Sequence, residues 1–347
     1  MQFYREQHKY YCGIDLHARK MYLCILDQKG RTKLHQNIDT DPELFFELIF
    51  PFLEDVVVGV ECVFCWYWLA DLCSEHKIPF VLGHALYMKA IHGGKTKNDK
   101  IDSYKIAALL RGGNLPMAYP YPARMRATRD LLRRRMHLVN KRAELLAHIQ
   151  NTNTQYNMEV IGKNLSKKCH RREIAQRFAD PATQLAVQTD VELINFYDQL
   201  LPKIEAHIER CALQHDPNAL YRLRTMPGIG QILGLSILYE VGDIGRFKTV
   251  QDFSSYARLI RPEKISDGKW AGTSNKKIGN HHLKHAINEA AMLFLRRSEL
   301  GRAYRQRLEK HHSAGKSYGI FTHKVGRAVY YMLKNNQAFS AKKFFSS

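Results

Sequence analysis

The chain has 347 residues, and its 53 lysines and arginines against 33 aspartates and glutamates give it a formal net charge of +20. This length predicts two or three domains with a real hydrophobic core, and the positive charge, spread over the whole chain, favours a folded surface that binds a polyanion. No apolar run approaches the roughly 20 residues of a membrane-spanning helix, which argues against a membrane partner, and the start MQFYREQHKYY lacks an apolar signal core, so we expect a cytoplasmic protein.

Residues 10–120 alternate strand-like and helix-like segments. The first three segments predict a strand hairpin and a third short strand: YYCGIDL, KMYLCILDQKG and KLHQNI. The next five predict a helix with an Asp cap, a β-branched central strand, a helix, a strand, and a helix that ends at a glycine pair: DPELFFELIFPFL, DVVVGVEC, CWYWLADLCSEHK, IPFVLGH and NDKIDSYKIAALLRGG. This order is typical of an α/β sheet domain with ribonuclease H-like topology, which we place at residues 1–122.

The seven cysteines have irregular spacing, which argues against a disulfide framework. Cys62 and Cys65 form a C-x-x-C pair, but no second pair follows at the spacing of a zinc ribbon. We therefore interpret these two cysteines as small apolar residues near the end of a strand.

A proline-rich linker, NLPMAYPYPA, separates this domain from two helical stretches. The first, residues 123–157, is basic and has leucines near heptad spacing: Leu131, Leu132, Leu138, Leu145 and Leu146. The second, from residue 190, has apolar residues at helical spacing: Leu193, Phe196, Leu200, Ile204 and Ile208. We expect residues 123–218 to form an antiparallel coiled-coil hairpin with a basic, irregular connection around 158–185. Such a hairpin serves as a dimerisation element or spacer, although its arginines also allow contact with phosphates.

From about residue 220 the chain predicts a mainly helical C-terminal domain, residues 219–347. Its first segment, LYRLRTMPGIGQILGLSILYEVGDIGRF, is similar to a helix-hairpin-helix unit, in which the backbone at Gly228 and Gly230 can bind a DNA phosphate. The alternative is an ordinary tight turn between helices. A Gly-, Ser- and Lys-rich stretch follows, and a strong helix begins near Asn280.

Four acidic residues occur in settings that suit a metal-dependent nuclease. Asp15 and Glu61 end or interrupt apolar runs that predict buried strands, while Asp99 and Asp102, three apart at a helix start, share one face. Buried carboxylates repel one another and lose hydration, so they rarely cluster without a counter-charge. A divalent cation is the natural counter-charge and a phosphodiester the natural substrate. The alternative is two strand-end caps and a solvated helix face.

Together these motifs give the chain a resemblance to the DEDD-type insertion-sequence transposases, relatives of the Piv-type DNA invertases, some of which are guided by a structured bridge RNA. The resemblance covers nearly the whole chain and rests on motifs in matching order. They are the GID strand, the Glu strand, the K-x-D-x-x-D helix at residues 97–102, the PGIG segment, VGDIGRF, FSSYARL and the Ser-Gly-rich loop before the last strong helix.

The resemblance implies a RuvC-like domain in which Asp15, Glu61, Asp99 and Asp102 hold a divalent metal, Mg²⁺ or Mn²⁺. It also implies a nucleophilic serine in the Ser-Gly-rich loop, at Ser266. The chain departs from the family pattern in two places: Cys-Val-Phe follows Glu61 where Ala and a small hydroxyl residue are usual, and Asp267 follows Ser266 where Gly is common.

Because a carboxylate beside the serine would disfavour the approach to phosphate, Ser274 is the alternative nucleophile. A loop-turn role is the ordinary interpretation of Ser266. The lysines that we expect to bind nucleic acid, as opposed to forming only a basic surface, are Lys97, Lys269, Lys276, Lys277 and Lys284.

The implied function is a DNA recombinase with a site composed from two domains. These domains could meet within one chain or between protomers, and the resemblance implies a site between protomers. Ser266 would attack a DNA phosphate and hold the strand covalently while strands are exchanged without a high-energy cofactor. Its partners would be donor and target DNA, a guide RNA and further copies of the chain, as a dimer or as a tetramer on DNA. The alternatives are a nuclease of the Holliday-junction type that uses metal-activated water, and a non-catalytic nucleic-acid binder.

Overall fold

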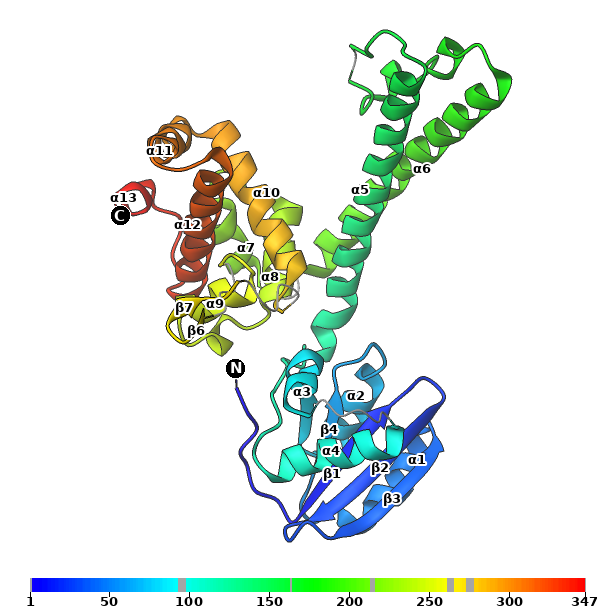
Figure 1. Cartoon of the computed structure of the whole chain (residues 1–347), viewed down its shortest axis with the longest axis vertical. Coiled ribbons are helices and arrows are strands. Elements are labelled where there is room, and N and C mark those ends of the chain that lie inside the picture. The colour runs from blue at the N-terminus through cyan, green and yellow to red at the C-terminus, as the bar shows by residue number, and fades with distance from the viewer. Residues whose placement is uncertain are drawn as a thin grey trace. The chain divides into compact units, whose positions relative to one another are not determined.

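The computed structural model describes residues 2–92, 98–162, 164–212, 216–260, 265–272 and 278–346. The chain divides into two compact units, residues 1–124 and 125–347, and each is described by itself (Figure 1). The further division of the second unit into a helical hairpin and a C-terminal domain stays a prediction. Lys97, Ser274, Lys276 and Lys277 lie outside the described residues.

The first unit contains a five-stranded mixed sheet in the order β3-β2-β1-β4-β5. The first three strands are antiparallel neighbours, whereas β4 is parallel to both β1 and β5. This arrangement confirms the predicted hairpin, third strand and two later strands, and it shows that the later two are parallel to β1. The strands are β1 (Tyr10–Leu16), β2 (Lys20–Asp27), β3 (Thr32–Asp39), β4 (Val56–Glu61) and β5 (Phe80–Gly83).

Helices cover both faces of this sheet. The helices of the first unit are α1 (Pro42–Ile49), the 3₁₀ turn η1 (Phe50–Phe52), α2 (Tyr67–Glu75), α3 (Ala85–His92) and α4 (Asp99–Arg111). One face packs α1 and α2 against alternate residues of the central strands, such as Ile14 and Val58. The other face packs α4 against the intervening residues, such as Tyr11 and Val57. This alternation is the period of two that a strand buried on both faces must have. The sequence predicted α1, α2 and α4 but not α3.

Two glycines let α4 lie directly on the sheet (Figure 1). A Cβ atom at Gly13 of β1 would lie 2.2 Å from the backbone nitrogen of Ala107, and one at Gly59 of β4 would lie 2.5 Å from Leu110 Cδ1. Any larger side chain at Gly13 would therefore push the helix backbone off the strand. The close contact brings the first turn of α4 to the carboxyl end of β1.

The second unit begins with two long antiparallel helices, α5 (Ala123–Gln155) and α6 (Pro181–Ala212). Ion pairs join them in reversed order along the chain: Arg135–Glu205 at 2.6 Å, Arg142–Asp198 at 2.7 Å and His148–Asp190 at 2.5 Å. The predicted hairpin is present. Its connection contains two short 3₁₀ turns, η2 (Lys168–His170) and η3 (Ala175–Arg177).

Two expectations for α6 were wrong. The helix begins at Pro181, well before residue 190, because Asp180 accepts a hydrogen bond from the Thr183 N–H and proline suits a first turn. Leu193 and Phe196 do not pack in the hairpin, since their exposures are 42% and 57%. The fully buried apolar residues of α6 are Val187, Val191, Ile194, Leu201 and Ile208. Of the predicted stripe, Ile208 is among them, and Ile204 is partly buried against the cluster that contains Ile208.

The remainder of the second unit is mainly helical, as predicted. Its elements are α7 (Pro217–Arg224), α8 (Gln231–Val241), η4 (Ile244–Arg246), α9 (Val250–Tyr256), the strand pair β6 (Ile265–Ser266) and β7 (Lys269–Trp270), α10 (His281–Arg297), α11 (Glu299–Glu309), α12 (Ala314–Lys334) and α13 (Ala341–Phe345). Fully buried Phe253, Phe294 and Phe321 lie in its core. None of the described helices is long and apolar enough to cross a membrane.

A buried carboxylate ties three helices of this unit together. Glu240 of α8 accepts hydrogen bonds from Arg133 of α5 at 2.6 Å and from Asn280, the N-cap of α10, at 2.7 Å, and it pairs with Arg129 at 3.0 Å. Burial disfavours the charged form of Glu240, but the hydrogen bond from Arg133 and the charges of both arginines outweigh burial and lower its pKa. The network therefore positions the start of α10.

Candidate metal centre

Asp15 and Glu61 lie on neighbouring parallel strands at the same edge of the sheet. The register of β1 and β4 pairs Ile14 with Val60, and the next residues along both strands are Asp15 and Glu61. Because Gly13 and Gly59 face α4, the alternation of side chains directs Asp15 and Glu61 to that same face. Both carboxylates are partly buried, and the side chain of Asp15 is only 14% exposed.

Asp99 and Asp102 occupy the first turn of α4. Asn98 begins the helix by accepting a hydrogen bond from the Lys100 N–H at 2.9 Å, and both carboxylates lie where the helix dipole favours negative charge. Asp99 is 60% exposed, while Asp102 is 23% exposed and pairs with Lys105 at 3.1 Å.

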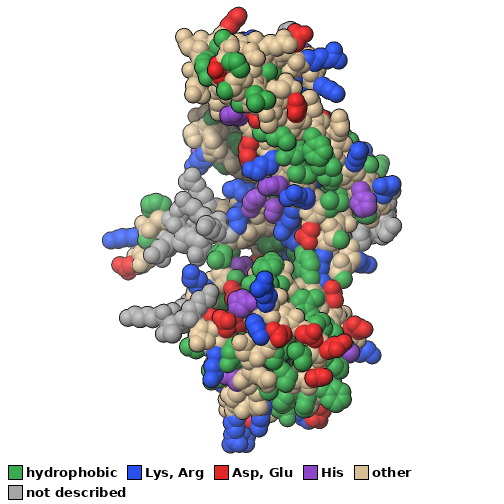
Figure 2. All heavy atoms as spheres, turned by 90° about the vertical axis from the view of Figure 1, so that its right-hand side faces the viewer, with side chains coloured by type: hydrophobic (Ala, Val, Ile, Leu, Met, Phe, Trp, Pro, Cys, Tyr) green, Lys and Arg blue, Asp and Glu red, His purple; other side chains and the backbone are tan. Residues whose placement is uncertain are grey.

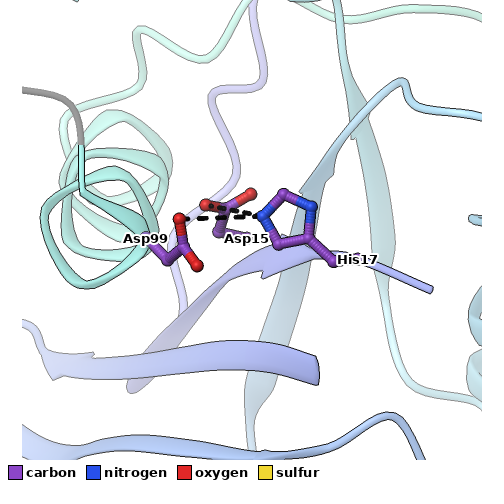
Figure 3. Close-up of side chains that lie close together, drawn as sticks. All are labelled: Asp15, His17 and Asp99. Atoms are coloured by element: carbon purple, nitrogen blue, oxygen red, sulfur yellow. Dashed lines mark ion pairs between the residues drawn. The ribbon is translucent and has the colours of Figure 1, made fainter. Parts of the chain in front are cut away.

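A histidine that the sequence analysis missed joins two of these carboxylates. The Nε2 atom of His17 lies 3.5 Å from Asp15 Oδ2 and 3.8 Å from Asp99 Oδ1 (Figure 3). One ligand atom from each of Asp15, His17 and Asp99 lies within 4.8 Å of the others, which is the only group of this kind in the described part of the chain. The sequence feature that could have revealed His17 is its spacing of two from Asp15, since residues two apart on an extended strand face the same side.

Asp15 lies close enough to the other three predicted carboxylates for their charges to act on it. Burial raises the pKa of the Asp15 carboxyl, the nearby charges of Asp99, Asp102 and Glu61 raise it further, and His17 opposes them. Glu61 and Asp102 are not in the compact group around His17, but they are close enough to act on Asp15 electrostatically. A divalent cation fits this set, because it would offset the repulsion and accept carboxylate oxygens together with one imidazole nitrogen.

Ser266 lies in the second unit, on an exposed two-residue hairpin. Ser266 pairs with Lys269 across β6 and β7, and the turn residues Asp267 and Gly268 both have positive φ, 51° and 69°. Two left-handed residues make the type of turn for which Asp-Gly is a preferred sequence. The turn geometry thus gives a local reason for Asp267, and both Ser266 and Lys269 are exposed to solvent.

Comparison with known protein families assigns both halves of the chain to one kind of protein. Residues 12–158 match a family model described as a DEDD transposase of the IS110 type, and residues 220–306 match the transposase family IS116/IS110/IS902. The chain belongs to this family. The first matched range includes the four carboxylates, and the second includes Ser266.

Two curated relatives of this IS110-type transposase family illustrate the likeness. One is y4qE of Sinorhizobium fredii, named as a candidate transposase, which is 26% identical over 222 residues, 63% of this chain and 53% of the relative. The other is the transposase for insertion sequence element IS1111A of Coxiella burnetii, 24% identical over 204 residues, 58% of this chain and 55% of the relative. The chain thus spans about half the length of these relatives.

The remaining predicted contact residues lie in the range that matches the second family model. A Cβ atom at Gly228, whose φ is +94°, would lie 2.5 Å from Ala290 O, so close packing against α10 by itself requires a glycine there. Gly230 is the N-cap of α8 and has open space where its Cβ would be. Lys284 is exposed on α10. Contact of these three residues with nucleic acid stays a prediction.

Proposed function

We propose that this chain is the DNA transposase of an insertion sequence, which cuts and exchanges DNA strands with a divalent metal, Mg²⁺ or Mn²⁺. The observation that carries the proposal is the meeting of Asp15, Asp99 and His17 beside Glu61 and Asp102 at the carboxyl ends of parallel strands. The order of the sheet, with three antiparallel strands followed by two parallel ones, supports a RuvC-like (ribonuclease H-like) catalytic domain.

Asp15, Glu61, Asp99 and Asp102 would hold the metal in this proposal, and His17 would complete the ligand set. When bound, a divalent ion polarises a phosphoryl oxygen and activates an attacking oxygen. Asp15 is the central ligand because its side chain is more buried than those of Asp99 and Asp102 and because the charges of the other three carboxylates act on it. The arrangement of α4 on β1 then determines how far the Asp99 carboxylate lies from Asp15.

Ser266 is the proposed nucleophile. As its Oγ–P bond forms, one P–O bond of the DNA strand breaks, so the number of phosphodiester bonds is conserved and strand exchange needs no high-energy cofactor. The exposure of the hairpin and the neighbouring Lys269 support this role, because a DNA strand can reach the hydroxyl and a cation stands opposite it.

The proposed partners are donor and target DNA, a guide RNA and further copies of the chain. Lysine and arginine side chains are spread over the face drawn in Figure 2, in keeping with the net charge of +20. Exposed Leu185, Leu193 and Phe196 on α6 support a dimer, since an amphipathic helix with a second apolar side suits contact with another copy. Sequencing of the nucleic acid that co-purifies with the chain tests whether an RNA guides it. A discrete structured RNA would support a guide, and its absence would count against one.

The decisive experiment compares two variants on a DNA carrying the ends of the element. Asp15→Asn should abolish both cleavage and strand exchange, because it removes the central ligand. Ser266→Ala should abolish strand exchange and the covalent protein–DNA adduct while the circular dichroism spectrum and the metal affinity stay unchanged. Full recombination by either variant would refute its assigned role.

A structure-selective nuclease is the second candidate. The observation in its favour is that the four carboxylates and His17 all belong to the first unit, whereas Ser266 belongs to the second. A site complete in one unit can direct water at the phosphate. Cleavage that continues unchanged in Ser266→Ala, without an adduct, would establish this function in place of the first.

A further inference from the structure

A cavity of about 600 Å³ lies beside the C-terminal half of α12. Its walls come from α12, from residues 335–340 and from α13, which lies next to α12 at the end of the chain (Figure 1). A volume of this size is in the range of about 300–1,000 Å³ of small-molecule sites, and it is too small to admit a nucleic acid duplex.

The charge of the lining residues is entirely positive. Lys324, Arg327 and Lys343 line the cavity, and none of the described residues that line it is an aspartate or glutamate. Aromatic rings hold Lys324 in place, since its Nζ atom lies 4.5 Å from the centre of the Tyr304 ring and 5.3 Å from that of Phe344, a residue of the cavity wall. Three cations around one hollow favour an anionic ligand, and a phosphate group is a suitable anion for arginine and lysine together.

Aromatic and amide side chains line the same cavity. Tyr331 of α12 is 44% exposed, and Phe339 lines the cavity from the segment after α12. An exposed ring provides a platform on which a base can stack, and amides such as those of Asn335 and Gln337 can pair with a base edge. Cations, rings and amides together match the three parts of a nucleotide.

The wall opposite α12 is anchored. The Phe339 N–H donates to Thr225 Oγ1 at 2.8 Å, and Arg222 Nη2 donates to Asn336 Oδ1 at 2.9 Å. These bonds tie residues 335–340 to the end of α7 and the turn after it. A cavity formed in advance loses less conformational freedom when a ligand binds.

We propose that this cavity binds one unpaired nucleotide of a nucleic acid strand, with its base against Tyr331 and its phosphate on Arg327 and Lys343. The inference rests on the proposed function only in that the strand belongs to the DNA or RNA partner. The bound nucleotide would fix a single-stranded segment on this part of the second unit, apart from any chemistry at Asp15.

The test measures fluorescence anisotropy of the full-length chain with 5′-labelled pentanucleotides, as single-stranded RNA, single-stranded DNA and a DNA duplex, in EDTA. Tyr331→Ala and Arg327→Gln should each weaken single-strand binding about tenfold, the size of effect expected for a lost stack or phosphate contact. Tyr331→Phe retains the ring and should bind like the wild type. Lys310→Gln, which removes an exposed charge at the end of α11, should change binding less than about twofold.

The two strand types identify the source of the nucleotide. Tighter binding of RNA or of DNA assigns the partner, and equal binding means that the sugar is not recognised. Each of these results supports the proposal if Tyr331→Ala weakens the binding. Photocrosslinking with 4-thiouridine RNA or 5-iodouracil DNA should label peptides from residues 327–344.

Two results would overturn the inference: wild-type affinity in folded Tyr331→Ala and Arg327→Gln, or crosslinks confined to other segments. Thermal melting checks that the variants fold. Because the assay needs neither metal nor cleavage, Asp15→Asn should bind the pentanucleotides normally. A lack of nucleotide binding in the cavity can therefore be distinguished from a lack of the proposed transposase chemistry.

Discussion

His17 Nε2 lies 3.5 Å from Asp15 Oδ2, which places an imidazole nitrogen inside a cluster of carboxylates. Magnesium prefers an all-oxygen shell, whereas manganese also accepts imidazole. This pairing therefore bears on which metal the site prefers.

His17→Ala should lower the affinity for Mn²⁺ about tenfold and the affinity for Mg²⁺ much less, because it removes the nitrogen ligand and leaves the oxygens. Isothermal titration calorimetry and the electron paramagnetic resonance of bound Mn²⁺ measure both affinities. His76→Ala, at an exposed histidine at the end of α2, is the matched control and should leave them unchanged. An equal loss for the two metals would contradict a selective role.

The raised pKa of Asp15 predicts a pH-dependent stability of the metal-free chain. An acid whose pKa is higher in the folded state stabilises the fold below its unfolded pKa, and that stabilisation is lost as pH rises through the folded pKa. At neutral pH the Asp15 charge should thus be unfavourable, and Asp15→Asn should raise the Tm of the metal-free chain.

Calorimetric melting with and without metal checks this sign. The gain in Asp15→Asn should shrink as pH falls and the wild-type carboxyl takes up its proton. Added Mg²⁺ or Mn²⁺ should stabilise the wild type and have little effect on the variant. A lower Tm for metal-free Asp15→Asn at neutral pH would show that the carboxylate is not strained by its neighbours.

Gly13→Ala should destabilise the first unit and weaken metal binding together. The new Cβ would lie 2.2 Å from the Ala107 nitrogen, so α4 must move, at a cost of about 1–3 kcal/mol or more, and Asp99 moves with it. Gly319→Ala in α12 is the control, because the Cβ atom would lie in open space; there the same change should stabilise the helix by up to about 1 kcal/mol. Urea unfolding measures both, and similar effects at the two positions would disprove the packing argument.

Glu240→Gln should destabilise the second unit by about 3–5 kcal/mol, because it leaves Arg129 and Arg133 facing each other without their shared carboxylate. The start of α10 should loosen as well, since Asn280 loses an acceptor. Chemical denaturation gives the free energy, and hydrogen exchange of residues 280–286 reports on the helix start. Glu144→Gln, at an exposed pair with Lys141, should change Tm little, and an equal effect of both variants would refute the network.

Much of the first unit followed from local patterns. Strand alternation, the Asp cap of α1 and the glycine after α4 are short-range features, so the order of strands and of three helices was predictable. The acidic residues stood out for the same reason, since a charge that ends an apolar run is visible without any tertiary contact. The turn at Asp267 and Gly268 is equally local, because two left-handed residues favour Asp-Gly.

By itself, the sequence determined the succession of strands and three of the helices in the first unit and the helical character of the second half, and it singled out four carboxylates as candidates, because periodicity and motif spacing are written along the chain. Only the tertiary structure decided that His17 joins Asp15, that Glu240 anchors α10 and that Leu193 and Phe196 stay exposed. The reason is that a helix with several apolar residues has more than one possible buried face. Which face is buried, and which polar groups meet, depends on partners far away in the chain.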